Sequence, residues 1–191
     1  MKRITLLFVV TALVAPASLW AKDLVGKPAP EFTAKDLNGK EHSLKTYRGK
    51  IVVLEWSNKD CPVWRSVLDK LNQTWADQVK SSADVVWLAV DSTHNMKPED
   101  AKAFMEKEKV ERPVLDDRDG TVGKAFDART TPHMFILDKD GKVVYDGALD
   151  NKGKGDDYVN YVAKALDELK AGKPVSEPQT NPYGCNVKYK K

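Results

Sequence analysis

The residue best suited to do chemistry is Cys61, in the stretch EWSNKDCPVWRS. It stands where a run of β-forming residues gives way to helical spacing, and Pro62 suits the first position of a helix. A cysteine at a helix N-terminus faces unpaired N–H groups and the positive end of the helix dipole, which both stabilise a thiolate. Lys59 and Arg65 add positive charge, and Asp60 opposes it. We therefore expect a nucleophilic thiol here rather than an inert buried one.

Two further groups could take part in such chemistry. Glu55 interrupts an apolar strand six residues before Cys61, and a carboxylate buried there needs a proton or a partner. It is a candidate proton carrier, unless the strand turns it toward solvent or a lysine. Thr131-Pro132, directly before another apolar strand, predicts a tight turn that could be cis. His133 follows and could act as a donor or base, or be an ordinary strand histidine.

The second cysteine of the chain, Cys185, lies in a proline-rich segment without periodicity. Two cysteines permit one disulfide, but only if their Cα atoms lie within about 7 Å, which the sequence does not fix. The pair could be a working redox couple or a structural staple. Metal binding is a weaker alternative, because His42, His94 and His133 lack paired ligand spacing, although folding could join Cys61 to two histidines. We expect no metal and no other cofactor.

The N-terminus of the 191-residue chain has the pattern of a secretory signal peptide. Residues 1–21 combine a charged start, an apolar run over residues 4–14 and small residues ending at Ala21. The run is too short for a comfortable transmembrane helix, so the processed chain should not span a membrane. We expect a periplasmic or secreted protein, in which cysteines tend to be oxidised. Without residues 1–21 the net charge falls from +3 to +1, which gives no reason to expect nucleic-acid binding.

The remaining pattern predicts an α/β domain with a central mixed sheet and helices on both faces. Ligand sites in such sheets gather at the carboxyl ends of strands, where Cys61 and the loop DSTHNMKP both lie. In chain order we expect a hairpin over 32–44, a buried strand over 50–56, a helix from 62 to 75, a strand over 83–91, a helix over 97–109, a short strand and helix over 112–126, a hairpin over 133–147 and a final helix over 156–172.

Taken together, these features resemble the thioredoxin superfamily. More narrowly they resemble its redoxin or peroxiredoxin-like branch, related to the alkyl hydroperoxide reductase/thiol-specific antioxidant group, and an exported bacterial subgroup within it. The motifs are VGKPAPEFTAKDLNGKEHSL, VVLEWSNKDCPV, TPHMFILDKDGKVVYDGALD and NPYGCNVKY. The resemblance implies a thioredoxin-like fold over 22–171 that includes an N-terminal hairpin extension, and a tail over 172–191 carrying Cys185. It also implies that Cys61 is the attacking cysteine, Glu55 the buried acid and Pro132 the cis-proline.

The chain differs from thioredoxins and from peroxiredoxins at positions that matter for the reaction. Trp64 stands where thioredoxins carry their second cysteine, so a partner for Cys61 within the chain must be Cys185. Asn58 stands where peroxiredoxins carry Thr or Ser. Arg65 and Arg129 are the available substitutes for the peroxiredoxin arginine.

The resemblance implies a thiol-dependent oxidoreductase with an antioxidant or disulfide-exchange activity. Cys61 would attack a peroxide or a substrate disulfide, and Cys185, on a mobile tail, would resolve the product. A thioredoxin-like protein or a small thiol would then restore the thiols. The alternative is a non-catalytic thioredoxin-fold binding module in which Cys61 and Cys185 form a structural disulfide.

Overall fold

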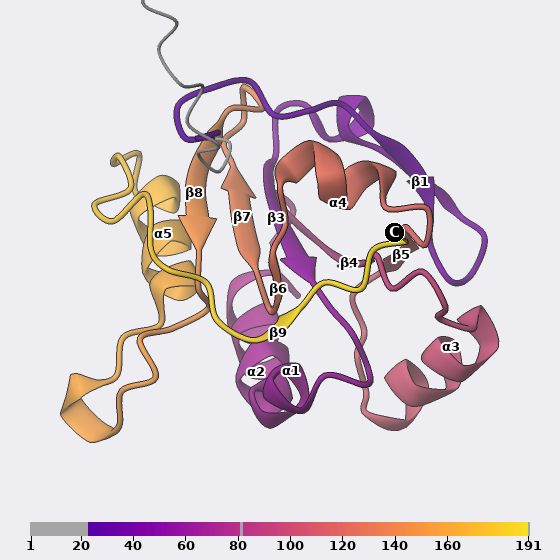
Figure 1. The fold of residues 1–191 in the computed structure, drawn as a ribbon. Coiled ribbons are helices and arrows are strands. Elements are labelled where there is room, and N and C mark those ends of the chain that lie inside the picture. Colours follow the sequence, from indigo (N-terminus) through magenta and orange to yellow (C-terminus); the bar gives the residue numbers. More distant parts are fainter. Residues whose placement is uncertain (1–22, 81, 191) are drawn as a thin grey trace, which may run out of the picture.

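Five strands form a central mixed sheet in the computed structural model, which describes residues 23–80 and 82–190 (Figure 1). Their order across the sheet is β5 (Val114–Asp116), β4 (Val85–Asp91), β3 (Ile51–Trp56), β7 (Met134–Leu137) and β8 (Val143–Gly147). The first three are mutually parallel, and β7 and β8 are antiparallel to their neighbours. The predicted α/β fold with a mixed sheet is confirmed. The predicted signal peptide, residues 1–21, lies outside the described residues.

Both faces of the sheet are covered by packed side chains. Alternate residues of β3 point to opposite faces and so enter different cores. Val53 faces a core that includes Trp64 and Leu71 from the helices after β3 and Leu166 from the last helix. Leu54 faces a second core. There Trp56 and Phe135 pack against Phe126 of α4 (Thr121–Phe126), with ring centroids 5.3 to 5.7 Å apart. Cys61, after the loop that follows β3, belongs to the first of these cores.

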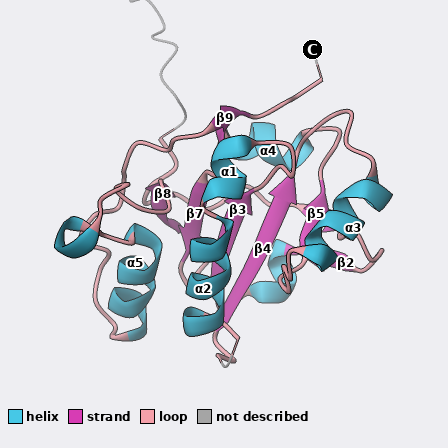
Figure 2. Ribbon diagram, turned by 90° about the horizontal axis from the view of Figure 1, so that it is seen from below, coloured by secondary structure: helices cyan, strands magenta, loops and turns pink. Residues whose placement is uncertain are grey.

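The helix predicted from residue 62 to 75 is two helices in the structure, α1 (Pro62–Ser66) and α2 (Leu68–Gln78). Val67 separates them with a non-helical backbone, while its side chain stays buried in the core. The final helix, α5 (Tyr161–Lys170), also begins later than predicted, because the Asn160 side chain accepts a hydrogen bond from the backbone N–H of Ala163 and caps it. Figure 2 shows α2 and α5 side by side on one face of the sheet.

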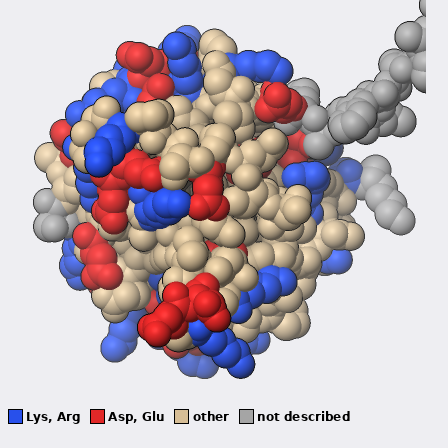
Figure 3. Space-filling model, turned by 90° about the vertical axis from the view of Figure 1, so that its left-hand side faces the viewer, with Lys and Arg blue, Asp and Glu red and all other residues tan. Residues whose placement is uncertain are grey.

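The first hairpin and the helix after β4 lie where the sequence predicts them. The first hairpin pairs β1 (Thr33–Lys35) with β2 (Glu41–Ser43), and α3 (Pro98–Lys107) follows β4. Two short 3-10 helices, η1 (Leu44–Tyr47) and η2 (Gly155–Asp157), complete the connections. In the described part of the chain, no helix is both long and apolar enough to cross a membrane. On the face drawn in Figure 3, basic and acidic side chains are interspersed, in keeping with the low net charge.

The C-terminal segment is held against the domain by hydrogen bonds and by one strand pairing. The Thr180 hydroxyl accepts a hydrogen bond from the backbone N–H of Ala148 at 2.9 Å, and the Tyr183 hydroxyl donates to Asp150. Farther on, β9 (Cys185–Asn186) pairs antiparallel with β6 (Thr130–Thr131), just before β7. Figure 1 shows this yellow segment crossing below β7 and β3 and ending near α4 and β5.

Candidate active site

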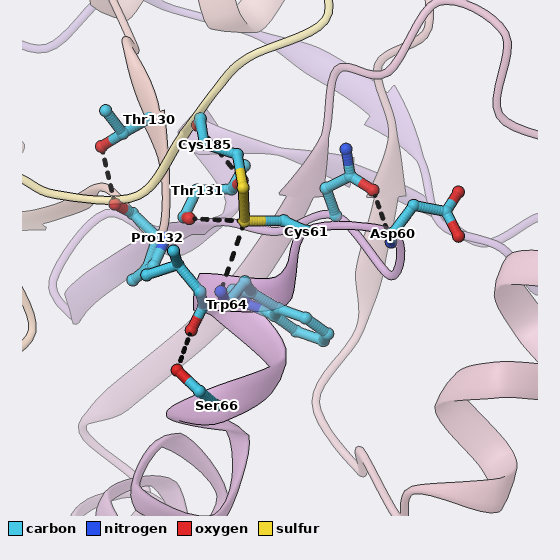
Figure 4. The surroundings of a disulfide bond; sticks show 10 residues. Asp60, Cys61, Trp64, Ser66, Thr130, Thr131, Pro132 and Cys185 are labelled. Carbon is cyan, nitrogen blue, oxygen red and sulfur yellow. Dashed lines mark hydrogen bonds between the residues drawn. A yellow bond between two sulfur atoms is a disulfide. The ribbon is translucent and has the colours of Figure 1, made fainter.

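Cys61 is the N-cap residue of α1, directly after the β3 strand and its short connecting loop. Its Sγ accepts a hydrogen bond from the backbone N–H of Trp64 at 3.3 Å, one of the amides left unpaired at the helix start. The same Sγ lies 3.2 Å from the carbonyl oxygen of Thr131 (Figure 4). Cys61 is only 1 % exposed. The predicted position of the cysteine at a strand-to-helix junction is confirmed.

A disulfide joins Cys61 to Cys185, with Cα atoms 5.9 Å apart and a sequence separation of 124. The pairing of β6 with β9 holds the second cysteine in place, since Thr131 lies opposite Cys185 and Thr130 opposite Asn186. The Thr131 hydroxyl also donates to the carbonyl of Cys185 at 3.4 Å. The tail therefore delivers its cysteine to Cys61 by main-chain pairing.

The Thr131–Pro132 peptide bond is cis, as the sequence allowed. Thr130 contributes to this turn, because its hydroxyl donates to the carbonyl of Pro132 at 2.8 Å. The turn brings the Thr131 carbonyl to the sulfur on one side and presents the edge of β6 to the tail on the other (Figure 4). Both Thr131 and Pro132 are buried.

His133 is buried on the other side of this turn and makes no hydrogen bond to Cys61. Its Nδ1 accepts the backbone N–H of Arg129 at 3.2 Å, which leaves the ring proton on Nε2. That Nε2 donates to the carboxylate of Asp146 at 2.7 Å. Both ring nitrogens therefore serve a buried network, and a catalytic role for His133 stays a prediction.

Glu55 is fully buried and is paired with an arginine that the sequence did not single out. Arg112 donates to both carboxylate oxygens, from Nε at 2.7 Å and from Nη2 at 3.0 Å, and both side chains are 0 % exposed. The indole N–H groups of Trp64 and Trp87 each donate at 2.8 Å. Neither solvent nor a lysine is the partner. Glu55 thus has four donors and links the base of α1 to the sheet, and its predicted role as a proton carrier stays untested.

Lys59 and Arg65, two basic residues close to Cys61 in the sequence, contact other side chains. Lys59 pairs with Asp60 at 2.9 Å, which neutralises the charge closest in sequence. The exposed Arg65 guanidinium lies over the ring of Phe104, 5.4 Å from its centroid. Arg129, the other candidate, is exposed, and its backbone carbonyl accepts the N–H of Val187 in the tail. The hydrogen-bond donor that contacts the sulfur is therefore a backbone N–H of α1, that of Trp64.

A cavity of about 440 Å³ lies beside the disulfide, with the predicted loop after β4 on one side. Its lining residues come from the Cys61 loop, the loop after β4 and the tail: Asn58, Asp60, Cys61, Pro62, Thr93, His94, Asn95, Cys185 and Lys188. A larger cavity of about 720 Å³ lies between α2, α5 and the loop around Tyr158, and neither cysteine lines it. The disulfide therefore borders the smaller, more polar cavity.

One buried carboxylate near this loop lacks a full set of partners. Asp91, the last residue of β4, is 0 % exposed, and its Oδ1 accepts the backbone N–H of Thr93 at 3.0 Å. Its Oδ2 has no hydrogen-bond partner within residues 23–80 and 82–190. Burial raises the pKa of Asp91 to about 6, with smaller contributions from Asp116 and Asp60. A polar residue that ends a buried strand is the sequence signal that would have found it.

These geometrical features agree with the comparisons with known proteins. Residues 25–146 match the family described as AhpC/TSA. The chain belongs to the AhpC/TSA family. Thiol-disulfide oxidoreductase ResA from Bacillus thuringiensis subsp. konkukian is 29% identical over 120 residues, which cover 63% of this chain and 67% of that protein.

Two further similarities extend over more of the AhpC/TSA chain. The chloroplastic Peroxiredoxin Q of Sedum lineare is 29% identical over 161 residues, covering 80% of this chain and 83% of that one. The crystal structure of an uncharacterized conserved protein from Geobacillus kaustophilus has a TM-score of 0.77 and 30% identity, covering 87% of this chain and 92% of that chain. This AhpC/TSA protein therefore has a thioredoxin-superfamily redoxin fold of the thiol-disulfide oxidoreductase type, with Cys61 and Cys185 joined in a disulfide.

No group of three or more His, Cys, Asp or Glu side chains in the described part of this AhpC/TSA chain is arranged to hold a metal ion. His94 lies near the disulfide, but its Nδ1 bonds the carbonyl of Lys188 at 2.9 Å. Both ring nitrogens of His133 are already hydrogen-bonded, to Asp146 and to the backbone of Arg129. The structure does not bring Cys61, His94 and His133 together as metal ligands.

Proposed function

We propose that this protein is an exported thiol–disulfide oxidoreductase in which Cys61 is the attacking thiolate and Cys185 the resolving cysteine. The observation that carries the proposal is the Cys61–Cys185 disulfide at the N-terminus of α1, where Trp64 N–H faces the sulfur. The helix start stabilises Cys61 as a thiolate and therefore as the leaving group when the disulfide is reduced. The ResA similarity supports the same class of reaction.

The proposed reaction conserves atoms and electrons in two exchange steps. The Cys61 thiolate of the reduced protein attacks a substrate disulfide R–S–S–R′, forms a mixed disulfide with R–S and expels R′–S⁻. The Cys185 thiolate then attacks Sγ of Cys61, expels R–S⁻ and forms the intramolecular disulfide. The substrate has gained two electrons and the protein has lost two. A thioredoxin-like dithiol or a small thiol restores the two protein thiols.

Disulfide exchange is favoured over peroxide reduction by the surroundings of the sulfur. A peroxide is activated best where a cationic donor lies beside the thiolate. Lys59 is paired with Asp60, and Arg65 lies over Phe104, so these two cations are engaged away from Sγ. The similarity to Peroxiredoxin Q keeps an antioxidant reaction as the second candidate.

Stopped-flow kinetics of the reduced protein distinguish these reactions. We expect rapid oxidation by a small disulfide, slower oxidation by hydrogen peroxide, and loss of both reactions in Cys61→Ser. Peroxide reacting faster than the disulfide would favour the antioxidant function. A protein that reacts with neither oxidant would support the alternative of a structural disulfide in a binding module.

Export is the second part of the proposal and is supported by the signal pattern of residues 1–21. An oxidising compartment would also let the disulfide persist. Expression of the full chain in a bacterium, followed by intact-mass measurement of the periplasmic fraction, should give a protein that begins at Lys22. Recovery of the unprocessed chain in the cytosol would contradict export.

A further inference from the structure

The end of the tail is bound to the domain as an extended peptide would be. Three consecutive positions pair with the chain before the cis-proline turn: Cys185 with Thr131, Asn186 with Thr130, and the N–H of Val187 with the carbonyl of Arg129 at 3.0 Å. Adding a strand to an exposed edge is a common way to bind an extended polypeptide independently of its side chains. Here the added strand also carries the sulfur that is bonded to Cys61.

The residue before the tail cysteine is selected by its size. Gly184 lies so close to the turn that a Cβ there would overlap the carbonyl oxygen of Thr131 and come within 3.2 Å of the nitrogen of Pro132. Both of these are backbone atoms beside the sulfur, which cannot swing aside as the end of a flexible side chain could. A polypeptide bound in this register therefore needs glycine directly before its cysteine.

A second recognition point lies four residues after the cysteine, at Tyr189. The hydroxyl of this half-buried side chain donates to the carbonyl of Ala128 at 2.8 Å. Its ring lies against two glycines at the start of α4, because a Cβ on Gly120 or Gly123 would come within 2.8 or 2.7 Å of ring carbons. Lys124 places its Nζ 5.8 Å from the ring centroid. We name Gly120, Gly123, Lys124 and Ala128 the tyrosine socket.

We propose that residues 184–189 are a tethered mimic of the polypeptide on which Cys61 acts, and that the tyrosine socket selects an aromatic side chain four residues after the substrate cysteine. This inference rests on the proposed function and names its substrate class. The substrate is an extended polypeptide with glycine before its reactive cysteine and an aromatic residue four positions after it. The tail and the substrate compete for the edge of β6.

Peptides test this specificity directly. The parent peptide is Gly-Cys-Asn-Val-Lys-Tyr, with its cysteine in a mixed disulfide with thionitrobenzoate. Its analogues replace the final Tyr with Phe or Ala, or the first Gly with Ala. The Cys61 thiolate attacks the peptide sulfur, forms the Cys61–peptide disulfide and releases coloured thionitrobenzoate. The full-length protein carries Cys185→Ser and Tyr189→Ala, so that its own tail neither resolves the product nor fills the socket.

We expect the Tyr and Phe peptides to react about tenfold faster than the analogue ending in Ala, as burial of part of an aromatic ring would give. The analogue with Ala before its cysteine should also be slower than the parent. Each rate is divided by the rate with dithiobis(nitrobenzoate), a small disulfide that cannot reach the socket. A protein with Cys185→Ser and an intact Tyr189 should react more slowly with the parent peptide, because its tail still competes.

The small disulfide separates failure of this inference from failure of the proposed function. Equal normalised rates for all peptides, with a Cys61-dependent reaction of the small disulfide, overturn the inference and leave the proposed function standing. Absence of reaction with the small disulfide overturns both. If circular dichroism shows that the double variant is unfolded, the same peptides are compared on the reduced wild-type protein. Release of thionitrobenzoate still reports the first step there, and the same order of rates is expected.

Discussion

Replacing the buried Arg112 with methionine should destabilise the protein far more than the same substitution at an exposed arginine that pairs with a carboxylate in the same way. Arg112 donates two hydrogen bonds to the fully buried Glu55 and a third to Asn72 at 2.8 Å. Methionine fills similar space but leaves the carboxylate without its counter-charge. Removing one partner of a buried ion pair costs about 3–5 kcal/mol. We expect Arg112→Met to lower the free energy of unfolding by that amount.

Arg118 provides the matched control. It pairs with Asp116 through the same two-pronged geometry, with both N–O distances at 2.8 Å, but its side chain is 43 % exposed. Solvent screening reduces the contribution of such a pair to the free energy of unfolding to less than about 1 kcal/mol. We expect Arg118→Met to lose no more than that. Urea unfolding of the oxidised proteins, followed by tryptophan fluorescence, measures both losses, because Trp64 and Trp87 contact Glu55.

A double variant identifies the cause of the loss. Glu55→Gln combined with Arg112→Met removes the stranded charge, so it should recover at least half of the stability lost in Arg112→Met. Equal losses for Arg112→Met and Arg118→Met, or no recovery in the double variant, would refute the assignment of Glu55 to a buried ion pair that supports α1.

Two further predictions concern the disulfide and the buried carboxylate. The double substitution Cys61→Ser, Cys185→Ser should lower the free energy of unfolding by about 2–5 kcal/mol, because the disulfide restricts a long loop of the unfolded chain. Denaturant titration measures the loss. A change under about 1 kcal/mol would be inconsistent with the disulfide. The pKa of Asp91 is raised from 3.8 to about 6, so the folded state holds this proton more tightly and wild-type stability should fall as pH rises from about 4 to 6. Asp91→Asn should lose that decline and be more stable at pH 7 by on the order of 1–3 kcal/mol; parallel pH dependences of the two proteins would contradict the assignment.

The part of the site that comes from continuous sequence was predictable. Cys61 at a strand-to-helix junction and the turn at Pro132 both depend on neighbouring residues, so local patterns predict them. The acid at Glu55 was also recognisable as unusual, because a charged residue interrupts an apolar strand.

Other features depend on partners that are distant in the sequence, which no local pattern specifies. Arg112 reaches Glu55 only because β4 and its loops bring residues 57 positions apart together. The Asn160 cap and the break at Val67 shift helix boundaries that periodicity alone extends too far. The tyrosine socket was missed for the same reason, since Tyr189 and Ala128 lie 61 positions apart in the sequence.

Trapping of the mixed disulfide is the most direct test of the central claim that Cys61 attacks and Cys185 resolves. Reduced Cys185→Ser protein is mixed with excess oxidised glutathione, quenched with acid and measured by intact mass spectrometry. We predict one glutathione adduct on Cys61, whereas the wild-type protein passes to its intramolecular disulfide without a lasting adduct. A Cys185→Ser protein that forms no adduct, or a wild-type protein that keeps its adduct with Cys185 free, would contradict the account.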